Sequence, residues 1–176
     1  MYPYLRMAYQ LAKHHNDDDL PLNGTHISQH ICWPIDIDPW RELNNGRTLT
    51  LYDLGRIAYI KRIPLAKVLR ENHWGMTMAG AAVRYRRRIR MFDRFEMRTK
   101  AIGRDARFIY IQQSMWRNDE AASSGLFRAA VVGKSGIIPT NTVCEKMQIP
   151  DWNPTMPDWV LEWIAAEAIR TWPPEV

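Results

Sequence analysis

The segment from Asp36 to Gly46, which reads DIDPWRELNNG, contains residue types that could direct an attack on a carbonyl carbon. Asp38 is held by the proline that follows it and could act as a general base or as a nucleophile. A helix that begins at Asn44 or Asn45 would aim its unpaired backbone N–H groups and the positive end of its dipole at a developing oxyanion, and Gly46 leaves room for close approach. Asp38, Asn45 and Gly46 are therefore candidate catalytic residues.

Glu42 lies four residues after Asp38 and is a second candidate acid. If the two carboxyl groups are close, their like charges discourage simultaneous ionisation and raise the pKa of one of them, and the pair could then transfer a proton. The alternative is an ordinary connection between a strand and a helix, in which Asp38 caps a turn and Glu42 points to solvent. The residue types alone favour this simpler interpretation.

Three arginines at alternate positions, Arg84, Arg86 and Arg88, are expected on one side of a strand, and Arg90 continues the series. Because arginine side chains bind phosphate oxygens in pairs, this basic stripe could contact the phosphates of a ligand. The alternative is a solvated outer face. Nucleic acid is not expected, because the stripe lacks the interleaved aromatic residues of a single-strand platform and no helix-turn-helix pattern accompanies it.

The elements that must position these residues follow from hydrophobic periodicity. A first strand is expected around residues 26–33, and a long helix begins at Asn44 or Asn45 and is interrupted at Pro64, which opens a second short helix. Four antiparallel strands are then expected, with breaks at 92–93, 103–105, 118–119 and 133 that suit hairpins. These strands cover residues 76–91, 94–103, 107–118 and 124–137.

One face of the strand at 94–103 should be covered, because Phe95, Met97, Thr99 and Ala101 alternate with charged residues. The long helix is the element that can cover it. The predicted fold class is therefore α+β, with a long central helix packed on the concave face of a five-stranded antiparallel sheet.

Extra helices are expected at both ends of the chain. Residues 2–15 predict a short amphipathic helix, whose packed face consists of Tyr4, Ala8, Leu11 and Ala12. Residues 158–171 predict a terminal helix with Trp159 and Trp163 on one face. Such tryptophans mostly dock a helix on its own domain, and a partner or a membrane surface is the alternative.

The bulk composition limits the class of protein. The 176 residues, 46% hydrophobic and 24% charged, suit a single domain over 1–176. Two cysteines without CxxC spacing favour a reducing compartment and predict neither a disulfide framework nor a zinc site, and His26 and His30 are too far apart along a strand to share a metal. The absence of a long apolar run and of a leader pattern favours a cytoplasmic protein, and the net charge of +5 favours anionic partners.

The segment PIDIDPWRELNNGRTLTLYDLGR resembles the acyl-CoA thioesterase branch of the hotdog superfamily that is related to 4-hydroxybenzoyl-CoA thioesterase. That family's pattern is Asp-x-Asp, then a His four residues on, then x-Asn-Asn-x-Arg-Tyr-Leu and later Asp-x-x-Arg. The detailed match covers residues 34–62, and the order of elements extends it over a core of about 26–138. Two positions depart from the pattern, since Glu42 replaces the histidine and Thr48 replaces the tyrosine.

The resemblance implies a hotdog fold, a catalytic carboxylate at Asp38, and functional roles for Asn44, Asn45 and Arg47. It also implies coenzyme A as part of the substrate, no other cofactor, and a homodimer or larger assembly with an acyl tunnel at the subunit contact. In this interpretation Asn44, Arg47, Arg84, Arg86 and Arg88 bind substrate. Two alternatives stay open: a hotdog protein that binds acyl-CoA without turnover, because of the two departures, and a peripheral membrane protein that uses its terminal helices.

Overall fold

Helix α2 (Asn45–Arg62) is the helix predicted after the asparagine pair, and it is the centre of the fold. In the computed structural model, which describes residues 2–174, the side-chain oxygen of Asn44 accepts hydrogen bonds from the N–H groups of Gly46 and Arg47 and so caps the helix. The helix ends where Pro64 approaches, because a proline disfavours helical geometry in the residue before it.

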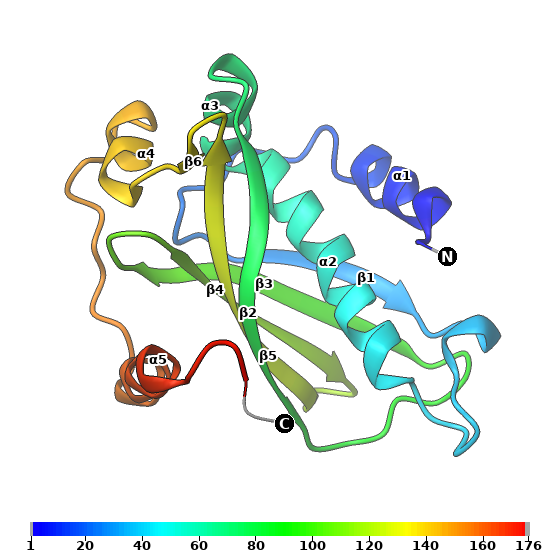
Figure 1. Cartoon of the computed structure of the whole chain (residues 1–176). Coiled ribbons are helices and arrows are strands. Elements are labelled where there is room, and N and C mark those ends of the chain that lie inside the picture. Colours follow the sequence, from blue (N-terminus) through cyan, green and yellow to red (C-terminus); the bar gives the residue numbers. More distant parts are fainter. Residues whose placement is uncertain (1, 175–176) are drawn as a thin grey trace.

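One antiparallel sheet curls around α2 (Figure 1). Its five main strands lie in the order β1-β3-β4-β5-β2, and the short β6 pairs with β5. This arrangement confirms the predicted α+β class and hotdog architecture, and it adds the two-residue β6 to the five expected strands. The strands are β1 His26–Ile31, β2 Gly75–Tyr85, β3 Arg94–Arg104, β4 Ile109–Arg117, β5 Glu120–Gly133 and β6 Gly136–Ile137.

The predicted strand at 76–91 is too long. Strand β2 ends at Tyr85, and the chain then crosses to β3, which lies at the other side of the sheet. The predicted hairpin at 92–93 is therefore wrong, because β2 and β3 are not neighbours.

The backbone after β2 turns out of the sheet at the arginine series. The N–H groups of Arg86 and Arg87 both donate to the carbonyl oxygen of Ala122, at 2.8 and 3.0 Å, and this shared acceptor ends the regular ladder. Only Arg84 of the predicted basic stripe lies in a strand, whereas Arg86 and Arg88 belong to the connection that follows. The prediction of one stripe on one sheet face is therefore wrong.

The concave face of the sheet packs on α2, as predicted. Phe95, Met97, Thr99 and Ala101 on β3 are all at most 2% exposed. Gly55 lets the helix come this close, because a Cβ atom there would collide with the sulfur of Met97.

A buried network of hydrogen bonds links α2 to β4. Arg56 donates to the side-chain oxygen of Gln113 at 2.6 Å and to Asp53 at 3.1 Å, and its guanidinium lies 4.1 Å from the centre of the Phe127 ring. Gln113 in turn donates to the backbone oxygen of Tyr52 at 2.9 Å. Asp53 and Arg56, the later acid and arginine of the family pattern, thus contact the core.

Helix α1 (Tyr4–Lys13) lies beside β1, the strand at one edge of the sheet (Figure 1). Arg6 donates to the backbone oxygen of Ile31 at 2.9 Å, and Gln10 donates to that of Gln29 at 3.0 Å. The helix therefore satisfies edge carbonyls that would otherwise be open to another strand.

The packed face predicted for this first helix is wrong. Tyr4 is 66% exposed, Ala8 and Ala12 are also exposed, and Gln10 is buried. The physical reason is the surface that the helix meets: the polar edge of a strand takes hydrogen bonds from polar side chains, so apolar periodicity does not identify the inner face.

Helix α5 (Asp158–Ile169) covers the opposite face of the sheet, where its Val160 and Trp163 pack on an apolar cluster. The register shifts between Ala101 and Gly103, which turns Ile102 toward this face. Trp163 docks on the domain as predicted, whereas Trp159 is 50% exposed. The remaining helices are α3 Leu65–Glu71, α4 Thr140–Lys146 and the short 3-10 helix η1 Pro34–Asp36.

Among residues 2–174, no helix combines the length and the apolar character that crossing a membrane would require.

Candidate active site

A buried carboxylate fixes the loop between β1 and α2. Asp36 is 0% exposed; its Oδ2 atom accepts hydrogen bonds from Arg6 at 2.6 Å and from the N–H of Trp33 at 3.0 Å. Its Oδ1 atom accepts two hydrogen bonds from the guanidinium of Arg47, at 3.0 and 2.8 Å. The side chain of Asp36 contacts α1, the loop and the first turn of α2. It therefore holds the loop in place between the two helices. Arg47, expected to bind substrate, thus contributes a structural ion pair.

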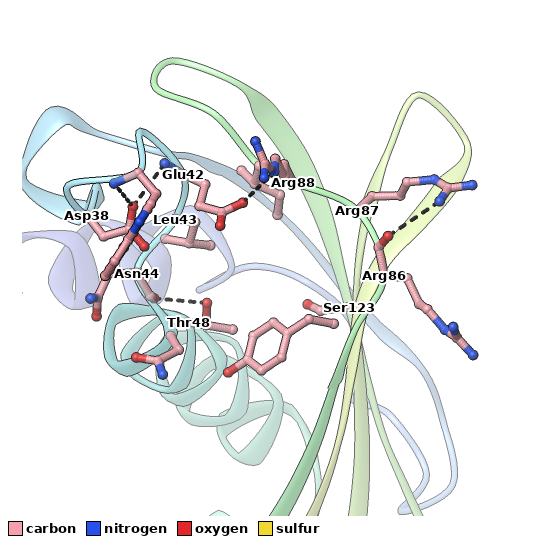
Figure 2. Close-up of a pocket in the computed structure, with 13 residues that line it drawn as sticks. Asp38, Glu42, Leu43, Asn44, Thr48, Arg86, Arg87, Arg88 and Ser123 are labelled. Carbon is pink, nitrogen blue, oxygen red and sulfur yellow. Dashed lines mark hydrogen bonds and ion pairs between the residues drawn. The ribbon is translucent and has the colours of Figure 1, made fainter.

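Asp38 lies at the tip of this loop and faces a cavity (Figure 2). Its Oδ1 atom accepts hydrogen bonds from the N–H groups of Trp40 at 2.9 Å and Glu42 at 3.2 Å, so the side chain caps a turn as the simpler interpretation expected. Its Oδ2 atom has no hydrogen bond to any residue in the described part of the chain. Oδ1 of Asp38 therefore fixes the position of the carboxylate, and Oδ2 remains available to accept a proton or a hydrogen bond.

The N-terminus of α2 lies against the same cavity, and most of its first-turn donors are already used. Gly46 and Arg47 donate to the side chain of Asn44, and Thr48 donates to the backbone oxygen of Asn44 at 2.8 Å. Within residues 2–174 this leaves the N–H of Asn45 as the first-turn donor without a hydrogen bond. The expectation that Gly46 supplies an open N–H is therefore wrong, because the capping asparagine occupies it.

The carboxylate of Glu42 is paired with an arginine, which neither interpretation of the sequence expected. Its carboxylate pairs with Arg88, Nε to Oε2 at 3.0 Å, and its backbone N–H holds Asp38 (Figure 2). Arg88 thus places a positive charge beside Glu42. Because Arg88 is 69% exposed, this pair adds little to folding stability and mainly sets the charge at the cavity.

The cavity has a volume of about 490 Å³ and lies between the loop, the start of α2 and the end of β2. Thr48, where the family has tyrosine, is 2% exposed and lines it with a short side chain, which leaves more room than a phenol would. Ser123 lines it from β5, and its hydroxyl is 2.8 Å from the hydroxyl of Tyr52. The full lining is Asp38, Trp40, Glu42, Leu43, Asn44, Asn45, Thr48, Tyr85, Arg86, Arg87, Arg88, Ile89 and Ser123.

The arginines form the rim of this cavity. Arg86 and Arg87 point away from Asp38 (Figure 2), and Arg87 pairs with Glu120 at 2.6 Å. Arg86 has no ion pair with any described residue. Arg84 does not line the cavity, so the structure brings together Arg86 and Arg88 but not Arg84 with Asp38, Asn44 and Asn45.

Sequence reasoning missed Ser123, Tyr85 and Tyr52. Ser123 is one of two adjacent serines, with Ser124, in a largely apolar strand, and nothing in the sequence sets it apart from its neighbour. Tyr52 reads as one more apolar residue of the helix, and burial raises the pKa of its hydroxyl, which keeps it protonated as a partner for Ser123.

Residues 2–174 contain no group of three His, Cys, Asp or Glu side chains arranged to hold a metal ion.

Comparison with known proteins identifies the relatives of this chain. Residues 32–164 match the model of the thioesterase-like superfamily. Protein THEM6 of Xenopus laevis is 30% identical over 142 residues, which make up 79% of this chain and 67% of that protein.

Two solved structures resemble this fold. DHNA-CoA thioesterase from Staphylococcus aureus has a TM-score of 0.58 and 13% identity, over 85% of this chain and 93% of that one. A thioesterase complexed with coenzyme A and Zn from Thermus thermophilus has a TM-score of 0.59 and 19% identity, over 73% and 95%. These two likenesses show the fold alone. The matched family model covers most of the chain and shows that this chain belongs to the thioesterase-like superfamily of hotdog-fold proteins, which supports a thioester hydrolase role in general terms.

Proposed function

We propose that this protein hydrolyses an acyl-CoA thioester to a free acid and coenzyme A. The observation that carries the proposal is that Asp38 and the start of α2, at Asn44 and Asn45, line one cavity. Membership of the superfamily supports the class of reaction, and the coenzyme A complex of a solved relative supports the class of ligand.

In the general-base form of the mechanism, Oδ2 of Asp38 takes a proton from a water molecule while that water attacks the thioester carbonyl carbon. The N–H of Asn45 and the positive end of the α2 dipole stabilise the oxyanion, and donors of this kind contribute about 10²–10³ in rate. The C–S bond then breaks, and the proton passes from Asp38 to the sulfur of the leaving thiolate.

In the nucleophilic form, Oδ2 of Asp38 attacks the carbonyl carbon itself. The thiolate of coenzyme A leaves, and a mixed anhydride between Asp38 and the acyl group remains. Water then hydrolyses this anhydride and restores the carboxylate. Both forms require the same open oxygen on Asp38 and the same donor at the helix start.

The nucleotide part of coenzyme A is assigned to the rim of the cavity. Arg86 extends outward without an ion pair among the described residues, and a phosphate is a suitable partner for its guanidinium. Arg88 is held by Glu42, so it contributes positive charge at a fixed position. Arg84 lies farther along β2 and is assigned only a long-range electrostatic role.

The edge of the sheet at strand β2 supports pairing with a second copy of the chain. Strand β2 is an edge strand, and its sequence GMTMAGAAVRY contains one charged residue, Arg84. Exposed edge strands usually carry more charged residues, which prevent pairing. Because Tyr85 ends β2 and lines the cavity, a second copy paired along β2 would lie beside the site. A Thr77→Lys/Ala81→Lys double substitution at exposed positions should halve the mass measured by light scattering. An unchanged mass would exclude pairing along this edge.

The function is tested with a panel of acyl-CoA esters of different chain lengths and aromatic groups. Release of free thiol is followed for the wild type and for Asp38→Ala, and the proposal predicts turnover of at least one ester that the variant loses. Turnover that is equal in the two proteins would overturn the role of Asp38.

A second candidate function is binding of an acyl-CoA without hydrolysis. The observations that favour it are the two hydrogen bonds that already engage Asp38 and the occupation of the Gly46 N–H by Asn44. Saturable binding of acyl-CoA esters, with no thiol released from any member of the panel, would select this function.

A further inference from the structure

A second cavity, of about 650 Å³, lies between α1 and the edge strand β1. It shares no lining residue with the cavity that contains Asp38. Its volume is in the range of sites that hold small organic ligands. Two of the buried side chains that line it each have one polar atom without a hydrogen-bond partner in residues 2–174.

The first of these side chains is Gln10, which is 4% exposed. Its Nε2 atom donates to the backbone oxygen of Gln29 at 3.0 Å, and because a carbonyl oxygen only accepts, the orientation of the amide group is fixed. Its Oε1 atom is therefore the acceptor, and this buried atom has no partner among residues 2–174.

The second side chain is His30, which is also 4% exposed and stacks on Phe95. Its Nε2 atom is 2.8 Å from the hydroxyl of Ser28, and its buried Nδ1 atom has no partner in the described chain. Burial, with a smaller contribution from the nearby charge of Arg6, lowers the pKa of His30 to about 3, so the ring is neutral near pH 7. In the tautomer in which the Ser28 hydroxyl donates to Nε2, the proton of the ring is on Nδ1, and Nδ1 is a donor.

The surroundings of this pair are both apolar and positively charged. Tyr9, which is 62% exposed, and Trp33, which is 45% exposed, provide aromatic surface. Lys13 and Arg94 are exposed at the same cavity, and neither has an ion pair within residues 2–174. In that tautomer the site presents one buried acceptor, one buried donor, an aromatic wall and two cations without an ion pair among the described residues, beside Arg6, which is paired with Asp36.

We propose that this cavity binds an N-acyl amino acid or a similar small amphipathic anion that contains an amide. An amide has both a donor and an acceptor, so its N–H satisfies Oε1 of Gln10 and its oxygen accepts from Nδ1 of His30. The carboxylate then lies near Lys13 and Arg94, and the acyl chain covers the aromatic surface. The proposal does not depend on hydrolysis at Asp38.

The test uses two ligands that differ in one group. N-dodecanoylglycine has the amide N–H, and N-dodecanoylsarcosine has a methyl group in its place. Titration calorimetry at concentrations below micelle formation should give saturable binding of the glycine compound and a dissociation constant roughly fivefold higher for the sarcosine compound, because Gln10 loses its donor.

Substitutions at exposed positions separate this cavity from the other one. Lys13→Glu/Arg94→Glu should weaken binding of N-dodecanoylglycine about tenfold, whereas Arg86→Glu at the rim of the first cavity should leave it unchanged. Asp38→Asn should also leave it unchanged, so this result is separate from the test of hydrolysis.

Three outcomes would overturn the proposal. Equal affinity for the two compounds would show that the amide is not recognised, and unchanged binding by Lys13→Glu/Arg94→Glu would place the ligand elsewhere. No saturable binding at millimolar concentration would leave water as the partner of Gln10 and His30.

Discussion

Replacing Asp38 by asparagine separates its two roles, because the side chain keeps its shape and loses its charge. The oxygen of the new amide can still accept from the N–H groups of Trp40 and Glu42, so the loop should keep its conformation. The amide cannot accept a proton from water or form an anhydride. We expect kcat for the best acyl-CoA ester to fall about 10²–10⁴-fold.

The expected cost in stability follows from the two hydrogen bonds. A hydrogen bond to a charged group contributes about 1.5–3 kcal/mol and a neutral one about 0.5–1.5 kcal/mol. Since Asp38 is partly exposed, the total loss should be about 1–2 kcal/mol, which lowers the melting temperature by roughly 2–8 °C for a domain of this size. The variant should therefore be folded at the assay temperature and inactive.

Asp36→Asn is the matched control, because it changes the neighbouring acid of the same loop. Asp36 is fully buried between Arg6 and Arg47, and removing one member of a buried ion pair costs about 3–5 kcal/mol. Thiol release and thermal unfolding measured on both variants should give opposite patterns, with activity lost in Asp38→Asn and stability lost in Asp36→Asn. A folded Asp38→Asn protein that keeps a tenth or more of the wild-type kcat/KM would refute the role assigned to Asp38.

Three further predictions concern other parts of the structure. Glu42→Gln releases Arg88 and should raise KM a few-fold with little change in kcat; a loss of kcat as large as that of Asp38→Asn would make Glu42 a catalytic residue. Burial lowers the pKa of His26 to about 4 and that of His30 to about 3, so below the ordinary value near 6.5 the unfolded chain binds more protons and stability falls as the pH falls. Urea unfolding should give a smaller free energy at pH 5 than at pH 7.5, and equal values would contradict the neutral buried rings. Gly55→Ala should lower the free energy of unfolding by about 1–3 kcal/mol, because the added methyl group meets β3, and a stabilised variant would contradict this close approach.

The loop before α2 shows how much local sequence could specify. The helix start, its capping asparagine and the proline that ends the helix all depend on residues a few positions apart, and the structure confirms them. The alternation along β3 likewise identified its buried face correctly. These features are local, so each depends mainly on residue type and spacing.

The roles of the charged residues could not be read in the same way. Arg47 was expected to bind substrate, and the structure shows it paired with Asp36. Glu42 was expected either to lie near Asp38 or to point to solvent, and it pairs with Arg88 from the connection that follows β2. A charged side chain is neutralised by whichever partner the fold brings near, and sequence spacing does not contain that information.

The sequence by itself determined the α+β class, the long helix and the capped start of that helix, because hydrophobic period, capping residues and a family motif all act over short stretches. Only the tertiary structure decided that the arginine series leaves the sheet after Tyr85, that Ser123 and Asp38 share a cavity, and that α1 turns Gln10 toward β1. The physical reason is that cavities and ion pairs form between segments far apart in the chain, so they exist only once the sheet has curled around its helix.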